Sequence, residues 1–417
     1  MKRKYLIKIL ILLFLVAATC FATDDQVGKS AAVKPGIDVL ISHDFKPLNG
    51  KRVGLITNNT GVTAELKSTI DVLWESKKVK LIALFGPEHG VRGNVFAGKK
   101  IATYKDEKTS LPVYSLYGKT RRPTPEMMHG LDAFVYDIQD AGYRAYTYIY
   151  TMAYAMEAAA QNELAFFVLD RPNPLGADFI EGPVLEEEFS SFIGLYPIPY
   201  IYGMTVGELA QYFNKEFGIN CKLTVIPMAG YNRNMRFEDT GLQWIPTSPH
   251  IPRANSAVFA ATLGNIGELH KISEGVGYTQ PFEVIGETWI NPDSFAAGLN
   301  KRQLPGVIFR PCYFRPYYFV NQGKELGGVQ IHITNLKLFS PMTVQMHLMH
   351  VLLKLYPENN IFKDVGAGRM SMFLKAMGTK SVSDGLLAGK TPDEIIQAWQ
   401  PKVDDFKKKR TKYLLYD

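Results

Sequence analysis

The chain has little cysteine and lacks the common nucleotide and serine-hydrolase motifs. Only three of its 417 residues are cysteine, which is too few for a disulfide framework or a structural zinc site. No Gly-x-Gly-x-x-Gly follows the first apolar run, and neither a Walker loop nor a Gly-x-Ser-x-Gly elbow is present. These absences disfavour a dinucleotide cofactor and a serine hydrolase, and we expect no cofactor and no bound metal.

The chain also has little excess charge once its N-terminus is set aside. Four Lys and Arg residues precede the apolar stretch Ile9 to Ala22, and acidic residues begin only at Asp24. This pattern predicts an export signal at residues 1–22, and the stretch is shorter than the roughly 20 apolar residues that a membrane span needs. Removing the four from 47 Lys and Arg leaves 43 against 40 Asp and Glu. No basic stripe is present, so we expect neither a nucleic-acid partner nor an integral membrane span.

Export sets the expected compartment. Cleavage after Ala22 would release the mature chain into the periplasm or the medium. Attachment of a lipid to Cys20 is the alternative. In either case the mature protein leaves the cytoplasm.

Five short apolar runs in the first half have the length of buried strands, and the helical pattern Tyr146 to Gln161 separates the last two. The runs are Val53–Thr57, Lys80–Phe85, Val113–Leu116, Ala133–Tyr136 and Phe166–Leu169. Strands that alternate with helices predict a parallel sheet covered on both faces. The fold class is therefore α/β.

The length predicts two domains, because a single core stops growing at about 250 to 300 residues. Proline and glycine interrupt the pattern between Pro197 and Thr205, and Thr205 with Glu208 forms a capping-box pattern at the start of a helix. Beyond it we expect a second α/β unit with strands near residues 222–227, 306–309 and 328–334 and helices near 292–300 and 342–356. The predicted domains are residues 36–203 and 204–417.

Polar residues follow each of the five runs, and the C-terminal ends of parallel strands open on one crevice. In Gly86-Pro87-Glu88-His89-Gly90 the proline and glycines restrict the turn. Such a placement suits Glu88 and His89 for acid–base work. The alternative is a turn whose Glu caps a helix and whose His satisfies a buried donor.

Other loops carry further candidates. One of Asp137 and Asp140 is expected to point into the crevice while the other is structural. Asp170 and Arg171 form either a binding pair or an ion pair that closes their loop. The guanidinium of Arg144 matches a carboxylate with two hydrogen bonds.

Two asparagines complete the candidates drawn from the residues themselves. Asn58 and Asn59 have amides suited to sugar hydroxyls, although asparagine also stabilises turns locally.

Together these motifs resemble the exo-β-N-acetylmuramidase family NamZ, formerly a family of exported bacterial proteins of unknown function. The resemblance rests on the motifs at residues 86–90, 114–126, 137–148, 169–174, 181–185, 203–205 and 281–286. It implies a Rossmann-like N-terminal catalytic domain without nucleotide, a smaller C-terminal α/β domain, and an active-site cleft between them. The chain departs from the family pattern at Val276, where relatives carry Arg, and at His250, where they carry Asn.

The resemblance implies a glycosidase that releases N-acetylmuramic acid from the non-reducing end of peptidoglycan fragments, with Glu88 as the catalytic residue. Hydrolysis needs a protonated carboxyl near the leaving oxygen. Asp137, Asp140 or the acetamido group of the substrate is the candidate for the second role. The lactyl carboxylate of muramic acid calls for a cation, for which the candidates are Arg92, Lys119 and Arg144. Further substrate-binding candidates within the matching motifs are Tyr146, Asp170, Arg171 and Glu283.

Two other classes of function stay open. A metal-dependent hydrolase would use His89, Asp137, Asp140 and Asp170 at the strand ends, and a chelator would inhibit it. A non-catalytic envelope glycan-binding protein would keep the cleft and bind without turnover.

Overall fold

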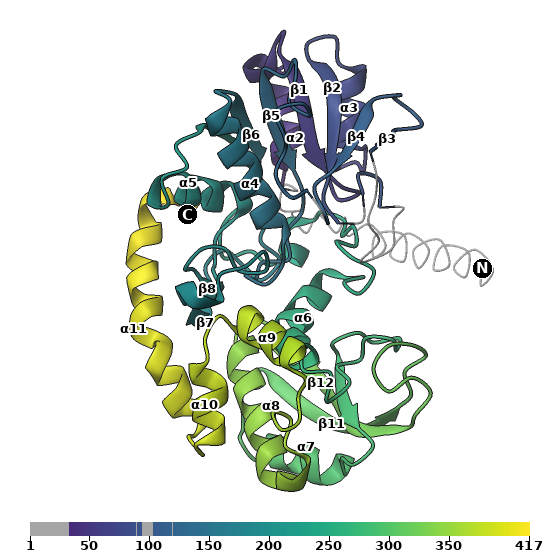
Figure 1. Cartoon of the computed structure of the whole chain (residues 1–417), viewed down its shortest axis with the longest axis vertical. Coiled ribbons are helices and arrows are strands. Elements are labelled where there is room, and N and C mark those ends of the chain that lie inside the picture. The colour runs from purple at the N-terminus through teal and green to yellow at the C-terminus, as the bar shows by residue number, and fades with distance from the viewer. Residues whose placement is uncertain (1–32, 89, 94–102, 119) are drawn as a thin grey trace, which may run out of the picture. The chain divides into compact units, whose positions relative to one another are not determined.

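The computed structural model describes residues 33–88, 90–93, 103–118 and 120–417. The predicted export signal, Cys20, His89 and Lys119 lie outside these residues. Within them, a seven-stranded sheet and a three-stranded sheet organise the chain (Figure 1). The predicted α/β fold class is confirmed.

The large sheet has the order β3-β4-β2-β1-β5-β6-β9. Its strands are β1 (Arg52–Thr57), β2 (Lys80–Gly86), β3 (Tyr104–Lys105), β4 (Pro112–Ser115), β5 (Ala133–Asp137), β6 (Ala165–Leu169) and β9 (Lys222–Ile226). All neighbouring pairs are parallel except β3 with β4. All five strands predicted for the first half are therefore confirmed, and β9 continues the sheet beyond residue 203.

Alternate residues of the central strands enter two separate cores. On one face, Val53 and Leu55 of β1 pack with α2 (Gly36–Ser42) and α3 (Thr69–Glu75). On the other face, Ile56 packs with α4 (Tyr148–Gln161) and α5 (Val206–Glu216). Burial on both faces explains why these strands are continuous apolar runs.

The second half builds a smaller α/β layer. Its antiparallel sheet has the order β10-β12-β11, with β10 (Val284–Glu287), β11 (Val307–Phe314) and β12 (Leu326–Ile333). The helices of this part are α6 (Ala254–Gly267), α7 (Pro292–Asn300), α8 (Pro341–Leu355), α9 (Ala367–Met377) and α10 (Ser381–Leu387). A third core joins this layer to β8 (Pro199–Ile201), the partner of β7 (Glu181–Val184). A second α/β unit is thus present, but its predicted strand near residues 222–227 was assigned wrongly, because β9 pairs with β6 in the large sheet. The boundary after residue 203 stays a prediction.

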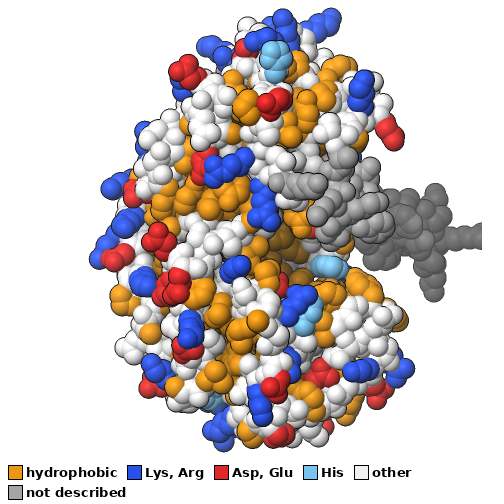
Figure 2. Space-filling view, viewed as in Figure 1, with side chains coloured by type: hydrophobic (Ala, Val, Ile, Leu, Met, Phe, Trp, Pro, Cys, Tyr) orange, Lys and Arg blue, Asp and Glu red, His pale blue; other side chains and the backbone are white. Residues whose placement is uncertain are grey.

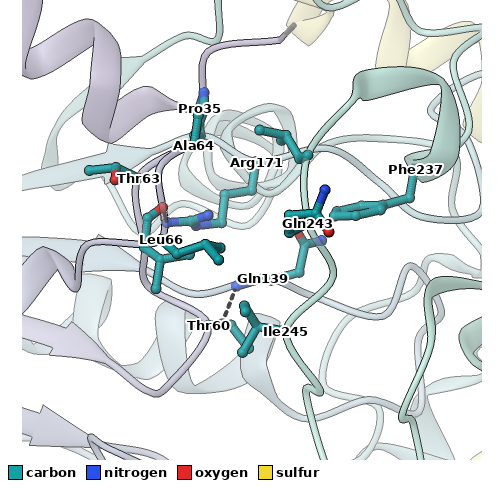
Figure 3. A pocket seen from close by; sticks show the side chains of 12 residues that line it. Pro35, Thr60, Thr63, Ala64, Leu66, Gln139, Arg171, Phe237, Gln243 and Ile245 are labelled. Atoms are coloured by element: carbon teal, nitrogen blue, oxygen red, sulfur yellow. Dashed lines mark hydrogen bonds between the residues drawn. The ribbon is translucent and has the colours of Figure 1, made fainter.

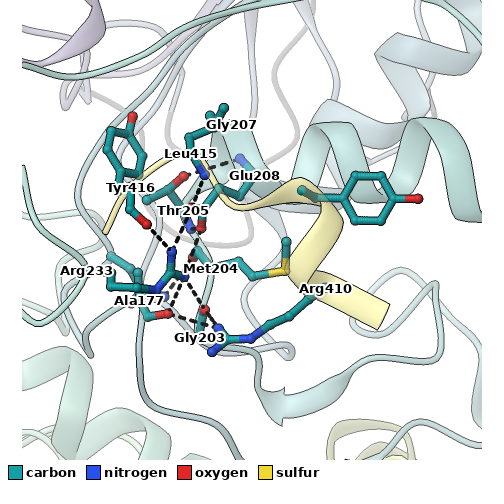
Figure 4. A network of polar contacts seen from close by, with 12 residues as sticks. Ala177, Gly203, Met204, Thr205, Gly207, Glu208, Arg233, Arg410, Leu415 and Tyr416 are labelled. Atoms are coloured by element: carbon teal, nitrogen blue, oxygen red, sulfur yellow. Dashed lines mark hydrogen bonds and ion pairs between the residues drawn. The ribbon is translucent and has the colours of Figure 1, made fainter. Parts of the chain in front are cut away.

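The last helix, α11 (Pro392–Arg410), returns to the large sheet and ends beside α5 (Figure 1). Figure 4 shows how the end of the chain is held there. Arg233 donates to the Ala177 carbonyl at 2.7 Å and pairs with Glu208, and the Glu208 carboxylate also accepts the Leu415 amide at 2.8 Å. Arg410 donates to the same Ala177 carbonyl at 2.9 Å. The C-terminal residues therefore stabilise the start of α5.

Three further predictions concern the start of helix α5, the two cysteines and membrane-spanning helices. The predicted capping box of Thr205 and Glu208 at the start of α5 is confirmed. Cys221 and Cys312 are free thiols and do not form the bridge that was possible from the sequence. None of the helices in the described residues is both long and apolar enough for a membrane crossing. Acidic and basic side chains are interspersed on the face shown in Figure 2.

Candidate active site

The chain reverses its direction of travel across the large sheet between β1 and β5, which is where open α/β sheets form a ligand crevice. The Thr57 hydroxyl at the end of β1 donates to the Asp137 carbonyl at 2.8 Å. In the loops that follow these two strands, the backbone amide of Gln139 donates to the Thr60 hydroxyl at 2.9 Å. The structure therefore brings these strand-end loops together, as predicted.

Glu88 follows β2, the neighbour of β1, and is partly buried. The Tyr117 side chain lies close enough for the Glu88 charge to act on its hydroxyl. Burial raises the pKa of Tyr117 to about 12, and the Glu88 charge adds to this rise. The hydroxyl therefore stays protonated beside Glu88. The Glu88 charge also acts on the buried Tyr148.

Asn58 and Asn59 stabilise the turn after β1. Asn58 is buried, and its side-chain oxygen Oδ1 accepts a hydrogen bond from the backbone amide of Thr60 at 2.9 Å. Asn59 donates to the Pro246 carbonyl at 2.9 Å, which links this turn to the proline-rich loop at residues 244–252. The Tyr148 hydroxyl donates to the Thr247 carbonyl of the same loop at 2.7 Å. This loop therefore lies against the strand-end cluster.

Asp137 and Arg171 form a buried, bidentate ion pair. Arg171 Nε lies 2.5 Å from one carboxylate oxygen of Asp137, and Nη2 lies 2.9 Å from the other. The Thr69 hydroxyl donates to the second oxygen as well. Both oxygens are thus bonded to protein donors, and neither side chain is exposed enough to meet a sugar.

A small cavity adjoins this ion pair. Arg171 and Gln139 line it together with Thr63, Ala64 and Leu66 (Figure 3). Its volume is about 20 Å³, which suffices for a water molecule and not for a sugar ring. The ion pair is therefore part of the support of the strand ends rather than of a saccharide pocket.

Asp140 lies below the crevice among tyrosines. One of its oxygens accepts the Gly142 amide at 2.8 Å and the Tyr202 hydroxyl. The other oxygen has no hydrogen-bond partner among the described residues. Burial raises the pKa of Asp140 to about 6.

Asp170 caps the start of α5. Its carboxylate accepts the Gly207 amide at 2.7 Å, the Thr205 hydroxyl at 2.7 Å and the Tyr416 hydroxyl at 2.6 Å. Burial raises its pKa to about 6. The Asp170 carboxylate also accepts the backbone amide of Arg171 at 2.9 Å. The Arg171 guanidinium pairs with Asp137 instead, so the ion pair expected between Asp170 and Arg171 is replaced by the pair of Arg171 with Asp137.

Two of the three predicted carboxylate-binding cations already have partners. Arg92 bonds both oxygens of Asp106, at 2.6 and 3.0 Å, and also contacts Asp71. Arg144 is fully buried and donates to four carbonyl oxygens, those of Pro183, Ile198, Ala376 and Met377. We therefore infer that neither arginine binds the lactyl group.

Tyr146 and Glu283 lie in different places. The Tyr146 ring stands between those of Tyr143 and Tyr148, with centroids 5.7 and 4.9 Å away. Glu283 directly precedes β10 and is half-buried near Arg253, and its burial raises the pKa of its carboxyl.

Within the described residues, no three His, Cys, Asp or Glu side chains are grouped as metal ligands would be.

A larger cavity lies beyond Tyr143, at the C-terminal end of α6, and we call it the α6 cavity. Its volume is about 300 Å³. Residues from both halves of the chain line it, among them Tyr143, Tyr200, His250, Glu268, Glu274, Val276 and Arg369. Sequence reasoning missed this cavity, although Val276 and His250 are two of the positions at which the chain departs from the family pattern.

Comparisons with known proteins agree with this architecture. The family model described as "Exo-beta-N-acetylmuramidase NamZ, N-terminal" matches residues 53–255, and the corresponding C-terminal model matches residues 261–416. The chain is 47% identical over 392 residues to the peptidoglycan β-N-acetylmuramidase NamZ of Bacillus subtilis strain 168, covering 94% of this chain and 93% of that protein.

Two crystal structures of DUF1343 family proteins from Bacteroides fragilis are also similar. One is 47% identical with a TM-score of 0.88, and the other is 28% identical with a TM-score of 0.74. Each comparison covers 93% of this chain and 99% of the other. The chain belongs to the exo-β-N-acetylmuramidase NamZ family.

Proposed function

We propose that this protein is an exo-acting glycoside hydrolase that releases N-acetylmuramic acid from the non-reducing end of peptidoglycan fragments. Membership of the NamZ family supports the reaction and the substrate class. The observation that carries the mechanism is the position of Glu88 just after β2, beside the Tyr117 hydroxyl. Muramyl saccharides from peptidoglycan are then its partners.

Glu88 serves as general acid and base in this proposal. A carboxyl group near the leaving oxygen protonates it as the glycosidic bond breaks. The Tyr117 hydroxyl holds the Glu88 side chain in one orientation. His89 follows it in the chain and remains a candidate for the same acid–base step.

The second catalytic role falls to the substrate. The oxygens of Asp137 are bonded to Arg171 and Thr69, and Asp140 is buried beneath Tyr202. Neither carboxylate is therefore exposed to a substrate, so we do not assign the role of nucleophile to either one. Attack by the acetamido oxygen of the sugar, as in other glycosidases of N-acetylated sugars, needs no further carboxylate from the chain.

Export and domain organisation complete the proposal. Residues 1–22 act as the export signal and place the protein in the periplasm or the medium, with a lipid on Cys20 as the alternative. Residues 36–203, together with α5 and β9 from the next segment, form the catalytic domain, and the remainder of residues 204–417 forms the second domain. The mass of the protein recovered from its host distinguishes cleavage after Ala22 from lipid attachment at Cys20.

The deciding experiment is incubation of the purified protein with a chromogenic β-N-acetylmuraminide beside the corresponding β-N-acetylglucosaminide. Selective cleavage of the muraminide is the expected result. Binding of muramyl sugars without turnover would instead identify a glycan-binding protein.

A further inference from the structure

The α6 cavity has the dimensions and the lining of a saccharide pocket. Its volume of about 300 Å³ lies at the lower end of the range for ligand sites. The rings of Tyr143, Phe282 and Phe319 line it together with polar groups. Apolar ring faces combined with a few polar side chains are suited to a sugar ring.

Arg369 is the one lysine or arginine among the described residues that line this cavity. It lies in the first turn of α9, and 47% of its side chain is exposed. Among the described residues its ion-pair partner is Glu268, whose carboxylate oxygen lies 3.9 Å from Nη1. That distance is too long for a hydrogen bond, so the guanidinium keeps N–H donors for a ligand. Arg144 and Arg171 are instead buried and bonded to protein oxygens, and Arg92 is bonded to Asp106 and Asp71.

The acidic residues of the cavity are held in place by burial. The Glu274 carboxyl packs against Gly267 at the end of α6, where a Cβ would lie 2.8 Å from its Cδ. Burial raises the pKa of Glu274 to about 7, and it also raises the pKa of Glu268. The cavity therefore offers both acceptors and donors to sugar hydroxyls, and it is not a uniformly negative site that would exclude a carboxylate.

The cavity lies next to the Glu88 cluster. Tyr143 lines it, and a tilted and an edge-to-face ring contact join Tyr143 to Tyr146 and Tyr146 to Tyr148. The Glu88 charge acts on Tyr148. The loop that bonds Asn59 and Tyr148 also carries His250 into the cavity wall. The cavity and the strand-end cluster therefore share a row of tyrosines and the loop at residues 244–252.

We propose that the α6 cavity binds the carboxylate-bearing sugar of the substrate and that Arg369 pairs with this carboxylate. The inference rests on the proposed function and names the residue that selects muramyl over glucosaminyl units. The carboxylate belongs either to the lactyl group or to a peptide attached to it. A guanidinium and a carboxylate form two parallel hydrogen bonds, which neither hydroxyls nor a neutral amide reproduce.

The test measures binding of free sugars, which the enzyme cannot hydrolyse, to the full mature chain. The ligands are N-acetylmuramic acid, N-acetylmuramoyl-L-alanine and N-acetylglucosamine, and titration calorimetry or ligand-observed NMR reports the affinity. We expect a carboxylated sugar to bind tighter than N-acetylglucosamine, and Arg369→Met to weaken it by about 10- to 100-fold. Arg369→Lys should recover part of this loss. The matched control is Arg315→Met, because Arg315 is 61% exposed and pairs with Glu325 at 3.5 Å.

The outcomes separate the carboxylate sources and the two proposals. A preference for N-acetylmuramic acid that Arg369→Met removes supports the lactyl group, and the same result with N-acetylmuramoyl-L-alanine supports the peptide. Unchanged affinity in Arg369→Met, or no binding of either sugar by the parent chain, would overturn the assignment. If the parent chain cleaves the chromogenic muraminide and Arg369→Met does so with the same KM, the proposed function stands and this inference fails.

Discussion

The carboxylate of Asp137 and the guanidinium of Arg171 form a two-point ion pair at the ends of two adjacent strands, β5 and β6. This contact closes the strand-end loops beside the crevice. Because neither oxygen of Asp137 is left for a substrate, the pair supports the site without taking part in the chemistry.

Asp137→Asn should therefore destabilise the fold. It leaves the Arg171 charge buried without its partner, and breaking a buried pair costs about 3–5 kcal/mol. Chemical denaturation measures the free energy of unfolding. The matched control is Asp132→Asn, because the Asp132–Arg52 pair at 2.8 Å is exposed and such pairs contribute about 1 kcal/mol or less. Equal losses in the two variants would contradict the structural role of Asp137.

Tyr117→Phe tests the contact with Glu88. Removing the hydroxyl takes away the neutral donor beside the Glu88 carboxylate. If that donor positions Glu88 in the reaction, kcat should fall by about 10- to 100-fold with little change in KM or in the melting temperature. Tyr196→Phe is the control, because the Tyr196 hydroxyl donates to Glu157 at 2.9 Å in another part of the fold. Full activity of Tyr117→Phe would show that this hydroxyl does not position Glu88.

The pKa of Asp140 predicts a dependence of stability on pH. The folded value is about 6 and the unfolded value is about 3.9, so the folded state binds the proton more tightly. The resulting stabilisation is complete below about pH 4 and is lost as the pH rises through about 6.

Asp140→Asn removes this contribution. Relative to the parent chain, the variant should therefore lose about 1–3 kcal/mol more at pH 4.5 than at pH 7.5. The free energy of unfolding measured at both values checks this. A difference between variant and parent that does not change with pH would contradict the assignment to Asp140.

The sheet is the part of the fold that the sequence predicts best. Strands such as β1 are buried on both faces, so apolar runs mark them directly. The helices α6, α9 and α10 were not predicted, because small residues and interspersed polar residues blur their periodicity. The free Cys221 and Cys312 likewise depend on distances that spacing does not reveal.

The convergence of the strand-end loops was easier to predict from the sequence than the partners of their side chains. Loops after parallel strands converge for topological reasons, which placed Glu88, Asn58 and Asp137 near one another. The partners of individual groups depend on packing between distant segments. Arg144 bonds carbonyl oxygens more than 200 positions along the chain, and Arg369 enters the α6 cavity from the far end of the sequence.

The most direct test of the account is Glu88→Gln assayed on the chromogenic muraminide. The variant keeps the shape of the side chain and removes its ability to transfer a proton, so we expect turnover to fall by more than about 100-fold at an unchanged melting temperature. Glu75→Gln, on an exposed residue paired with Lys67, should match the parent chain. Selective cleavage of the muraminide by the parent and its loss in Glu88→Gln are the predicted results, and retained turnover in Glu88→Gln would contradict the account.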